Sequence, residues 1–557
     1  MGNRVMNADE QQAGSLSDDP LWYKDAVFYE LHLRAYNDSD GDGIGDFRGA
    51  MEKLEYLQWL GIDCIWILPM YPSPLVDDGY DIADYRDIHP DLGTLEDFEA
   101  FVEKAHGLGM RVVTDLIMNH TSDQHPWFQA SRRREAPYTD WYVWNDTDDK
   151  YNEVRIIFLD HQPSNWAWDE RRQQYFWHRF YAEQPDLNFD NPEVQEEIKD
   201  VIRFWLAKGL DGFRADAIPY LYEREGSSGE NLPETHDYLK GVRRMIDREF
   251  PGRILLGEAN MWPEDVRPYF GDEDDPELQM SFHFPVMPRI FKALKLQEAA
   301  PIIEIMARTP DIPSEAQWVT FLRNHDELTL EMVTEEDRQW MWEQYAPEPR
   351  MRLNLGIRRR LAPLLDNDRR KIELANSILF TLPGSPIIYY GDEIGMGDNI
   401  HLPDRHGVRT PMQWESSETA DFSDGDPDDF YNPIIRSAPY GPETVNVAEQ
   451  RNDPNSLLSL MRHLIRVRKS SAALGRGDHR FLAVENPHIL AILREADGET
   501  VLALHNLSEE WQEVTLPLDE WAGHTPRELL FDDRLAPITE APYTLVLPAF
   551  AYRWLRL

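Results

Sequence analysis

Short hydrophobic runs rich in β-branched and aromatic residues alternate along most of the chain with segments of helical periodicity. The runs that predict strands cover residues 26–33, 64–68, 111–116, 212–214, 254–257, 319–322 and 386–389. The helical segments between them include residues 95–108, 194–208 and 238–250. Strands that alternate with helices indicate a parallel sheet, and Asp, Glu, His and Asn residues gather just after these strands. We therefore expect an α/β fold, a (β/α)8 TIM barrel with its chemistry at the carboxyl ends of the strands.

Long polar segments that carry aromatic residues interrupt this alternation. Residues 119–186 are too many for an ordinary loop, so we expect a small inserted domain after the third strand. Residues 326–368 and 399–453 are candidate lids over the active site. From about residue 475 short strands and turns predict a C-terminal antiparallel β-sandwich domain, residues 475–557. The barrel is then formed by residues 21–118 and 187–474, and residues 1–20 are expected to be a disordered tail.

Acidic residues far outnumber basic ones, with 101 Asp and Glu against 56 Lys and Arg, which gives a formal net charge of −45. A surface of this sign repels phosphate groups and anionic lipid, which excludes nucleic acid and membranes as partners. No apolar run is long enough to span a bilayer, and the polar N-terminus has no signal-peptide core. We expect a cytoplasmic protein that can form a homo-oligomer. Its single cysteine, Cys64, permits no intrachain disulfide.

Three acids stand where predicted strands end. Asp216 follows Gly-Phe-Arg-Ala, Glu258 follows Leu-Leu-Gly, and Asp326 follows Arg-Asn-His. A closed barrel brings such strand ends to one mouth. Cleavage of a glycosidic bond needs carboxylates there, because one attacks or stabilises the anomeric carbon while another protonates the leaving oxygen. One such acid alone is more often a solvated or capping carboxylate, but three beside Arg, His or Asn favour a glycosidase-type site.

The sequence around these acids resembles a known family. The stretches DLIMNH, GFRAD, LGEAN and FLRNHD, together with QPDLN and VRTPMQW, are similar to motifs of the α-amylase superfamily of retaining glycoside hydrolases. QPDLN is typical of its oligo-1,6-glucosidase branch. The fuller contexts GFRADAIPYLYER, LGEANMWPEDV and RNHDELTLEMV resemble the trehalose synthases of that branch, which interconvert maltose and trehalose. The resemblance covers nearly all of the chain after about residue 20.

The resemblance implies a role for each acid. Asp216 would be the nucleophile, Glu258 the general acid and base, and Asp326 the acid that stabilises the transition state. Arg214, two residues before Asp216, would lower the pKa of the nucleophile, and burial among apolar neighbours would raise the pKa of Glu258. The implied enzyme is an intramolecular transglucosylase that interconverts maltose and trehalose by a retaining double displacement, with minor hydrolysis to glucose.

The resemblance also implies residues that hold the sugar. They are Asp77, Tyr80, His120, Arg214, His325 and Arg409. Asp77 and Tyr80, in the run VDDGYD, resemble the carboxylate and the stacking ring that hold the non-reducing glucose, and Arg409 resembles the partner of Asp77. An arginine–carboxylate pair that closes the site leaves room for one glucose and predicts a disaccharide substrate. Asp78 stands where many members of the branch carry Asn or Met.

Two structural cation sites are predicted, and no organic cofactor is expected. The run DSDGDGIGD places carboxylates at alternate positions around a glycine turn, which suits Ca²⁺, with Mg²⁺ also possible. The ligands there would be Asp38, Asp40, Asp42, the Ile44 carbonyl and Asp46. The resemblance implies a second Ca²⁺ between the barrel and the inserted domain. Its ligands would be Asn119, Asp186, Glu223 and the carbonyls of Tyr220 and Leu221.

Other activities remain open at this point. A hydrolase of the same branch, an α-glucosidase of the oligo-1,6-glucosidase type, would share all three acids and differ only in its lid residues, for which Trp340, Trp342 and Tyr345 are candidates. A sucrose isomerase fits the quoted contexts less well. A non-catalytic barrel, as in the ancillary chains of amino-acid transporters, would lack the full set of acids and carry a membrane helix.

Overall fold

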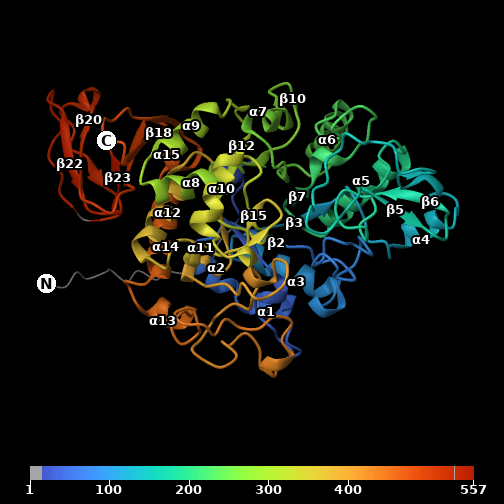
Figure 1. The fold of residues 1–557 in the computed structure, drawn as a ribbon. Helices are drawn as coiled ribbons and strands as arrows, with labels where there is room; N and C mark the ends of the chain where they lie inside the picture. Colours follow the sequence, from blue (N-terminus) through green and yellow to red (C-terminus); the bar gives the residue numbers. More distant parts are fainter. Residues whose placement is uncertain (1–15, 532) are drawn as a thin grey trace.

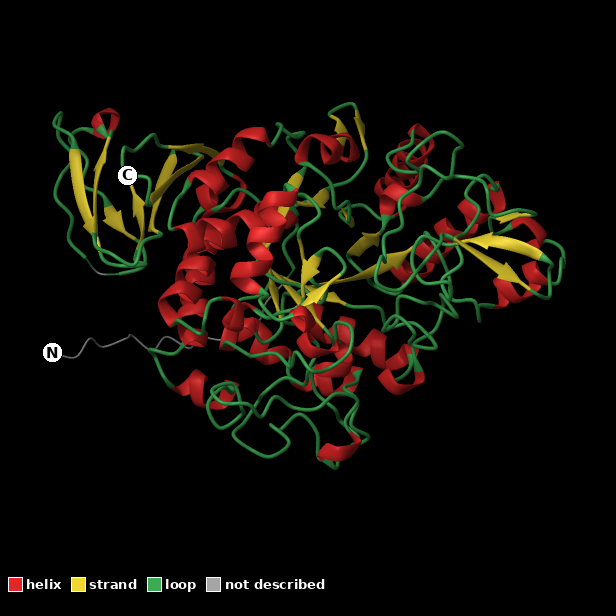
Figure 2. Ribbon diagram, in the orientation of Figure 1, coloured by secondary structure: helices red, strands yellow, loops and turns green. Residues whose placement is uncertain are grey.

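The computed structural model describes residues 16–531 and 533–557, and at its centre is a closed barrel of parallel strands (Figures 1 and 2). In their order around the barrel the strands are β1 (Phe28–Leu31), β2 (Cys64–Ile67), β3 (Arg111–Ile117), β7 (Gly212–Asp216), β8 (Ile254–Gly257), β11 (Met280–Phe282), β12 (Gln317–Phe321) and β16 (Ser385–Tyr389). Every residue of these strands is buried, because helices cover the outside and side chains fill the inside. The predicted TIM barrel is confirmed.

The strand β11 is the one barrel strand that the hydrophobic pattern did not predict. It has only three residues, and polar Gln279 and His283 flank it, so it shows no hydrophobic run. Its place is fixed by pairing on both sides, since Met280 lies opposite Leu256 of β8 and Gln317 of β12. The barrel closes only with this strand, which makes its position a property of the whole sheet.

Helices surround the barrel (Figure 2). The main ones are α1 (Phe47–Glu52), α2 (Leu54–Leu60), α3 (Leu95–Gly107), α5 (Pro192–Ala207), α6 (Pro233–Glu249), α8 (Val286–Leu296), α9 (Ala300–Arg308), α12 (Arg369–Thr381) and α14 (Leu457–Lys469). α3 shows why they begin and how they pack. Thr94 and Asp97 form a capping box at its N-terminus, and Phe98, Phe101 and Val102 at helical spacing are buried.

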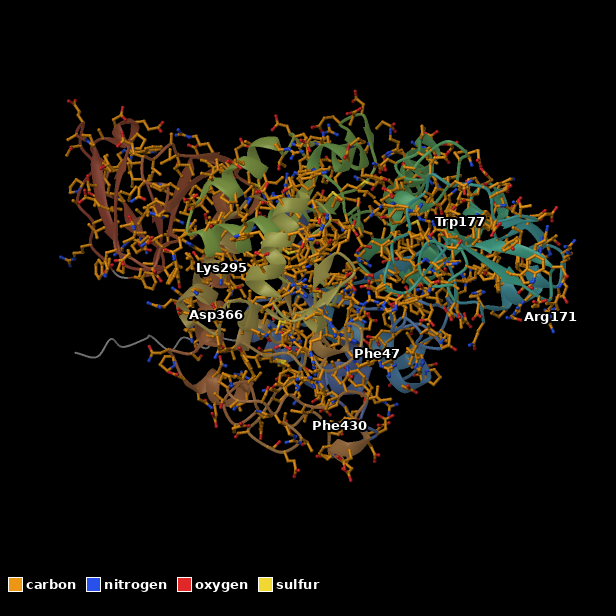
Figure 3. All side chains as sticks on the ribbon, viewed as in Figure 1. Phe47, Arg171, Trp177, Lys295, Asp366 and Phe430 are labelled. Carbon is orange, nitrogen blue, oxygen red and sulfur yellow. The ribbon has the colours of Figure 1, made fainter. Side chains whose placement is uncertain are left out.

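The segment between β3 and α5 forms a small separate unit, at the right of Figure 1. It contains α4 (Pro126–Arg132) and an antiparallel sheet of β4 (Trp144–Asn145), β6 (Gln174–Trp177) and β5 (Trp166–Asp169). A local core of Val154, Trp166 and Trp177 holds it together, and Trp177 is marked in Figure 3. The unit rejoins the barrel where His120 pairs with Asp186 as an isolated antiparallel bridge.

The two candidate lid segments differ in structure. Residues 326–368 contain β13 (Leu328–Thr329), α10 (Glu335–Tyr345), β14 (Arg352–Leu353), β15 (Gly356–Ile357) and α11 (Leu361–Leu364). The three strands form one small antiparallel sheet. Residues 399–453 are mostly loop with short 3-10 turns, and end in α13 (Val447–Asn452); they lie along the lower edge of Figure 1.

The C-terminal domain lies at the left of Figure 1, and two antiparallel sheets build it. The first contains β17 (Asp478–Phe481), β18 (Ile489–Ala496), β19 (Glu499–Asn506), β23 (Tyr552–Arg556) and β21 (Arg527–Glu528), and the second β20 (Gln512–Leu516) and β22 (Tyr543–Leu547). Leu493, Leu502 and Leu555 of the first sheet share a core with Val514 and Leu547 of the second. The predicted antiparallel β-sandwich is confirmed.

The N-terminal tail is described only from residue 16, so most of the segment expected to be disordered lies outside the described residues. The part that is described makes ordered contacts. Arg111 Nη2 donates to the Ser17 carbonyl at 2.6 Å, and Arg476 Nη2 lies 2.7 Å from Asp19 Oδ2. Residues 16–20 therefore differ from the expected disordered tail. Among the described residues, none of the helices combines the length and the apolar character needed to cross a bilayer.

Candidate active site

The three acids predicted from the sequence meet at the carboxyl ends of the barrel strands. Asp216 is the last residue of β7, Glu258 directly follows β8, and Asp326 follows β12. All three line one cavity. The inserted domain and both lid segments add Ile157, Phe158, Phe180, Glu327, Thr329, Glu331 and Arg405 to its walls. A cavity built by strand ends and long insertions is the usual location of an active site in a TIM barrel.

One buried guanidinium contacts two of these acids. Arg214 lies two residues before Asp216 on β7, so both side chains leave the strand on the same face. Arg214 Nη1 donates to Asp216 Oδ1 at 2.6 Å and to Asp115 Oδ1 at 2.5 Å. Arg214 Nη2 lies 2.7 Å from Glu258 Oε1, and the ring of Trp66 packs on the guanidinium at 5.3 Å. Arg214 therefore holds Asp216 and Glu258 next to each other.

Burial decides how this pair titrates. Burial raises the pKa of Asp216 to about 6, although the positive charge of Arg214 opposes the shift. Burial raises the pKa of Glu258 to about 7, again against Arg214. Arg214 lowers the pKa of Asp216 as predicted, but loss of hydration, which that prediction did not include, is the larger effect and the net shift is upward. Between the two values Asp216 is mostly ionised while Glu258 is mostly protonated.

Asp326 is held by positive charges on both oxygens. Arg405 Nη1 donates to Asp326 Oδ1 at 2.7 Å and Arg409 Nη2 to the same oxygen at 3.2 Å, while His325 Nε2 lies 3.2 Å from Oδ2. Although burial opposes the effect, His325 and Arg405 hold the pKa of Asp326 well below its ordinary value. Burial also opposes protonation of His325, but Asp326 and Glu30 outweigh it and raise its pKa to about 9. At neutral pH Asp326 is an anion beside a cationic His325.

Tyr80 and His120 line the cavity, and His325 packs behind Tyr80. The rings of Tyr80 and His325 stack with centroids 5.5 Å apart, and the Tyr80 hydroxyl lies 2.9 Å from His325 Nε2. Burial lowers the pKa of His120 to about 3, so its imidazole is neutral at physiological pH. Gln184 Nε2 lies 3.4 Å from His120 Nε2. A flat ring together with fixed hydrogen-bonding groups suits one face of a sugar.

Asp77 pairs with Arg405 and not with Arg409, which corrects the assignment made by resemblance. Arg405 Nη2 donates to Asp77 Oδ1 at 2.6 Å, and Gln184 Nε2 donates to Asp77 Oδ2 at 3.0 Å. Arg409 binds Asp78 Oδ2 instead, at 2.8 Å. A 3-10 turn separates the two arginines along the chain, so each of them reaches a different carboxylate. Sequence spacing alone does not distinguish these two pairings.

Some residues of the cavity were not predicted. Arg405 and the rings of Phe158 and Phe180 form part of its wall. The guanidinium of Arg405 also lies over the Phe158 ring, 5.7 Å from its centroid. Gln184, whose side chain contacts Asp77, could have been predicted, since it is the first residue of the motif QPDLN. The aromatic residues of the inserted domain had no such signal, because they lie in irregular loops.

The aromatic residues predicted as lid walls have another role. Trp340, Trp342 and Tyr345 of α10 are absent from the cavity lining among the described residues. Tyr345 donates its hydroxyl to the Phe291 carbonyl at 2.7 Å, and Trp342 Nε1 donates to the Gly356 carbonyl at 3.3 Å. Tyr345 therefore fixes the 326–368 segment to the barrel, and Trp342 fixes α10 to the small sheet of the same segment.

The inserted domain contacts the 326–368 segment at Glu331, which lines the cavity, and at a second point. Arg155 Nη1 donates to Glu331 Oε2 at 3.2 Å, and Arg155 Nε donates to Glu230 Oε1 at 2.8 Å. The Asn354 backbone N–H donates to Asp160 Oδ2 at 2.9 Å. We call these three hydrogen bonds the entrance contacts. Two of them, from Arg155 to Glu331 and from Asn354 to Asp160, join the inserted domain to the 326–368 segment, and the third joins Arg155 to Glu230 on the connection between β7 and α6.

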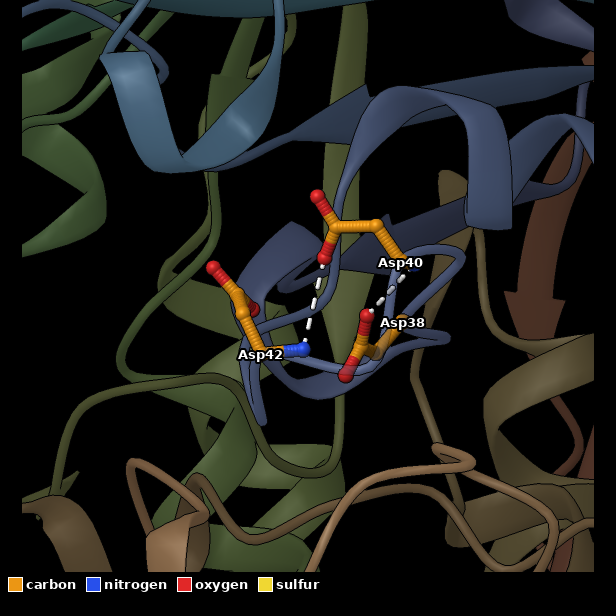
Figure 4. Close-up of side chains that lie close together, drawn as sticks. All are labelled: Asp38, Asp40 and Asp42. Carbon is orange, nitrogen blue, oxygen red and sulfur yellow. Dashed lines mark hydrogen bonds between the residues drawn. The ribbon is translucent and has the colours of Figure 1, made fainter.

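Three of the carboxylates assigned to the first predicted cation site form a cluster (Figure 4). Oxygens of Asp38, Asp40 and Asp42 lie within 4.8 Å of one another. Asp38 Oδ2 also accepts hydrogen bonds from Ser423 Oγ at 2.6 Å and from the Gly43 N–H at 2.8 Å. The cluster therefore lies against the 399–453 segment, and its carboxylates suit a hard divalent cation.

Two further residues assigned to that site behave differently. Asp46 lies outside the cluster because its carboxylate caps α1, where it accepts from the N–H groups of Gly49 and Ser39, both at 2.8 Å. Its assignment as a ligand stays a prediction. The Ile44 N–H donates to Asp42 Oδ1 at 2.8 Å, so Ile44 turns its N–H toward the cluster.

At the second predicted site, Asp186 and Glu223 interact between the barrel and the inserted domain. Asp186 is 1% exposed, and its Oδ2 has no hydrogen-bond partner among the described residues. Asn119 lies beside the same carboxylate. Burial and the charge of Asp186 raise the pKa of Glu223 well above its ordinary value. Tyr220 and Leu221 lie on the connection between β7 and Glu223, and Tyr220 lines the cavity. A cation between the two acids would satisfy the free oxygen.

Comparison with known proteins places the chain in a family. The α-amylase catalytic domain matches residues 31–347 and 357–477, and the C-terminal domain of maltogenic amylase matches residues 479–554. The chain is 54% identical to a trehalose synthase/amylase of Mycobacterium tuberculosis, with all of this chain and 94% of the relative covered. It is 53% identical to a trehalose synthase of Pimelobacter sp., with 97% of each covered.

Solved structures agree with this result. The crystal structure of a trehalulose synthase from Pseudomonas mesoacidophila matches with a TM-score of 0.78 at 28% identity, covering 96% of this chain and 99% of that one. The similarity to these proteins extends over nearly the full length of the chain and includes the barrel and the C-terminal sandwich. The chain therefore belongs to the α-amylase family and, within it, to the trehalose synthases.

Proposed function

We propose that this protein is an isomerising transglucosylase that interconverts maltose and trehalose. The observation that carries the proposal is Arg214, whose guanidinium holds Asp216 and Glu258 side by side at the ends of adjacent strands, where burial raises the pKa of both carboxyl groups. Retaining cleavage of a glycosidic bond requires one ionised and one protonated carboxyl group. The relatives named trehalose synthase support trehalose as one sugar of the pair, and the resemblance of the motifs implies maltose as the other.

The reaction then has two displacements. The Asp216 carboxylate attacks the anomeric carbon of maltose, the bond to the leaving oxygen breaks, and Glu258 gives that oxygen its proton. A β-glucosyl ester forms on Asp216. The released glucose turns within the cavity and attacks the same carbon through its own anomeric hydroxyl, while Glu258 takes the proton and the ester bond breaks. Two inversions retain the α configuration, and Asp326 would stabilise the positive charge that develops on the ring.

The entrance contacts favour isomerisation over hydrolysis. The glucosyl ester is cleaved by whichever hydroxyl reaches it, so water must be excluded and glucose retained. Arg155 and Glu331 join the inserted domain to the 326–368 segment, and Asn354 with Asp160 joins them a second time. Phe158 narrows the same space. An α-glucosidase would need this entrance to be open for the release of glucose.

The test follows the fate of the cleaved glucose. Maltose incubated with isotopically labelled free glucose should give trehalose with almost no label, because the glucose that leaves is the one that attacks. The products are separated by chromatography and counted. Heavy incorporation of label, or glucose as the main product, would identify the protein as an α-glucosidase instead.

We further propose structural Ca²⁺ at both predicted sites. Asp38, Asp40 and Asp42 supply carboxylate oxygens at the first, and the unpartnered oxygen of Asp186 beside Glu223 supports the second. Neither ion contributes to the chemistry; each would stabilise a loop against the barrel. A homo-oligomer and a location in the cytoplasm stay predictions from the sequence.

A further inference from the structure

A chain of polar side chains runs beside the cavity from the end of β1 to Asp326. His32 directly follows β1 and is 3% exposed, and its Nε2 lies 3.0 Å from Asp78 Oδ2. The same oxygen of Asp78 accepts a hydrogen bond from Arg409 Nη1 at 2.8 Å, while Arg409 Nη2 donates to Asp326 Oδ1 at 3.2 Å. Among the described residues, Asp78 and His32 are absent from the cavity lining. They reach the reaction only through Arg409.

Arg409 needs a negative partner on its far side. Its side chain is 2% exposed, and Arg405 brings a second guanidinium to the same oxygen of Asp326. Two buried cations this close repel each other strongly. Asp77 balances Arg405, and Asp78 is the matching carboxylate for Arg409. Burial and Arg405 oppose the charge on Arg409, yet Asp78 and Asp326 hold its pKa above the ordinary value.

Further hydrogen bonds hold the Arg409 side chain and backbone in one orientation. Arg409 Nε donates to the His325 carbonyl at 2.9 Å, and Asn432 Nδ2 donates to the Arg409 carbonyl at 3.1 Å. Asp78 is fixed as well, since its φ of 49° is a backbone conformation that Asp and Asn adopt more readily than other side chains. Both ends of the Asp78–Arg409 pair are therefore rigid.

We propose that Asp78, oriented by His32, is a positioning residue for glucosyl transfer. It fixes and neutralises Arg409, which with Arg405 holds the Asp326 carboxylate in the orientation that meets the reacting sugar. The inference rests on the proposed function, because it takes Asp326 to act on the transition state.

The direct test is Asp78→Asn, which keeps the shape and the backbone conformation and removes the charge. We expect kcat for maltose conversion to fall by about tenfold or more while KM changes by less than about threefold, because a displaced Asp326 affects the transition state more than the ground state. The matched control is Asp84→Asn, an exposed carboxylate on the same connection between β2 and α3, which should change neither constant.

The same variants are assayed for release of p-nitrophenol from p-nitrophenyl α-glucoside, which reports formation of the glucosyl ester whatever product follows. If the wild type makes no trehalose, the proposed function fails, while the ratio of Asp78→Asn to wild type on this glucoside still tests the positioning role. Unchanged kcat on both substrates in Asp78→Asn would overturn the inference.

A double-mutant cycle identifies the route. If Asp78 acts through Arg409, the variant Asp78→Asn with Arg409→Gln loses no more activity than Arg409→Gln alone. Losses that multiply would overturn the inference, because they place the two residues on separate routes. A fall in kcat that matches a fall in the folded fraction, measured by thermal unfolding, would also overturn it, since the effect would then be on stability alone.

Discussion

The three acids are held by two sets of positively charged neighbours. Arg214 holds Asp216 and Glu258 together, and two further arginines hold Asp326. Burial acts to raise the pKa of all three. The positive charges oppose this by different amounts, so that Asp326 stays ionised well below neutral pH while Glu258 is still protonated near it. Three carboxyl groups of similar chemistry thereby acquire different proton occupancies in one cavity.

The first prediction at this scale concerns the nucleophile. Asp216→Asn should leave the fold intact and lower kcat by roughly five orders of magnitude, about 7 kcal/mol, because no covalent intermediate can form. Steady-state rates with maltose and a circular dichroism spectrum measure the two effects. Substantial residual turnover in a preparation free of wild type would remove Asp216 from this role.

The pH dependence is the second prediction. The active form has Asp216 ionised and Glu258 protonated, so kcat/KM should rise as pH passes about 6 and fall as pH passes about 7. Because the two groups interact, the limbs belong to the pair and not to single residues. Initial rates over a pH series in buffers of constant ionic strength provide the profile. A profile that is flat from about pH 5 to 9 would contradict the assignment.

At the scale of elements, the entrance depends on two insertions that meet. Arg155 of the inserted domain is 38% exposed and bonds Glu331 and Glu230. Arg155→Ala should lower trehalose formation and raise the glucose share of the products by at least about twofold, because water then reaches the glucosyl ester. Product ratios at early conversion of maltose measure this effect.

The control for the entrance is an arginine of the same domain outside the cavity. Arg133 forms an exposed pair with Glu135, and Arg133→Ala should leave the glucose share unchanged. If both variants raise glucose equally, general loosening of the inserted domain is responsible and the entrance contacts are not.

The loop before α1 carries a prediction on stability. Changing Asp40 and Asp42 together to Ala should lower the melting temperature and reduce its dependence on Ca²⁺ to the part that the second site contributes, since an ion bound only to the folded state at about a hundredfold excess contributes roughly 3 kcal/mol. Scanning calorimetry with Ca²⁺ and with a chelator measures both effects. Asp424 and Asp428 are exposed acids of the neighbouring segment, and their double change to Ala is the control. A melting temperature that is the same in chelator and Ca²⁺ for wild type would remove the ion from this loop.

On the scale of the whole molecule, the net charge of −45 makes electrostatic repulsion between surface groups important for the stability of the folded state. Mutual repulsion of surface carboxylates destabilises the compact state, and the Debye length shortens from about 10 Å at 0.1 M salt to about 3 Å at 1 M. We expect the melting temperature to rise between 0.05 and about 1 M KCl. Thermal unfolding followed by circular dichroism, with sucrose as an uncharged comparison, measures this. A fall in melting temperature would mean that the surface ion pairs outweigh the repulsion.

The sequence by itself determined the barrel, the inserted domain, the C-terminal sandwich and the three acids. These features are local in origin: hydrophobic periodicity defines strands and helices, and a parallel barrel places whatever follows its strands at one end. Asp216, Glu258 and Asp326 were therefore accessible from short motifs. So were Tyr80, His120 and the cluster of Asp38, Asp40 and Asp42.

The tertiary structure decided the features that depend on burial contributed by many segments together, or on contacts between residues far apart in the sequence. The strand β11 exists because its neighbours leave one gap in the barrel, and a run of three residues carries no periodicity of its own. Asp77 binds Arg405, and Arg409 binds Asp78, because the path of an irregular loop places the two guanidinium groups beside different carboxylates. The pKa of Asp216 is raised because burial by distant segments outweighs the adjacent arginine. A local sequence pattern specifies neither the path of a loop nor the amount of water that the complete fold removes from a side chain.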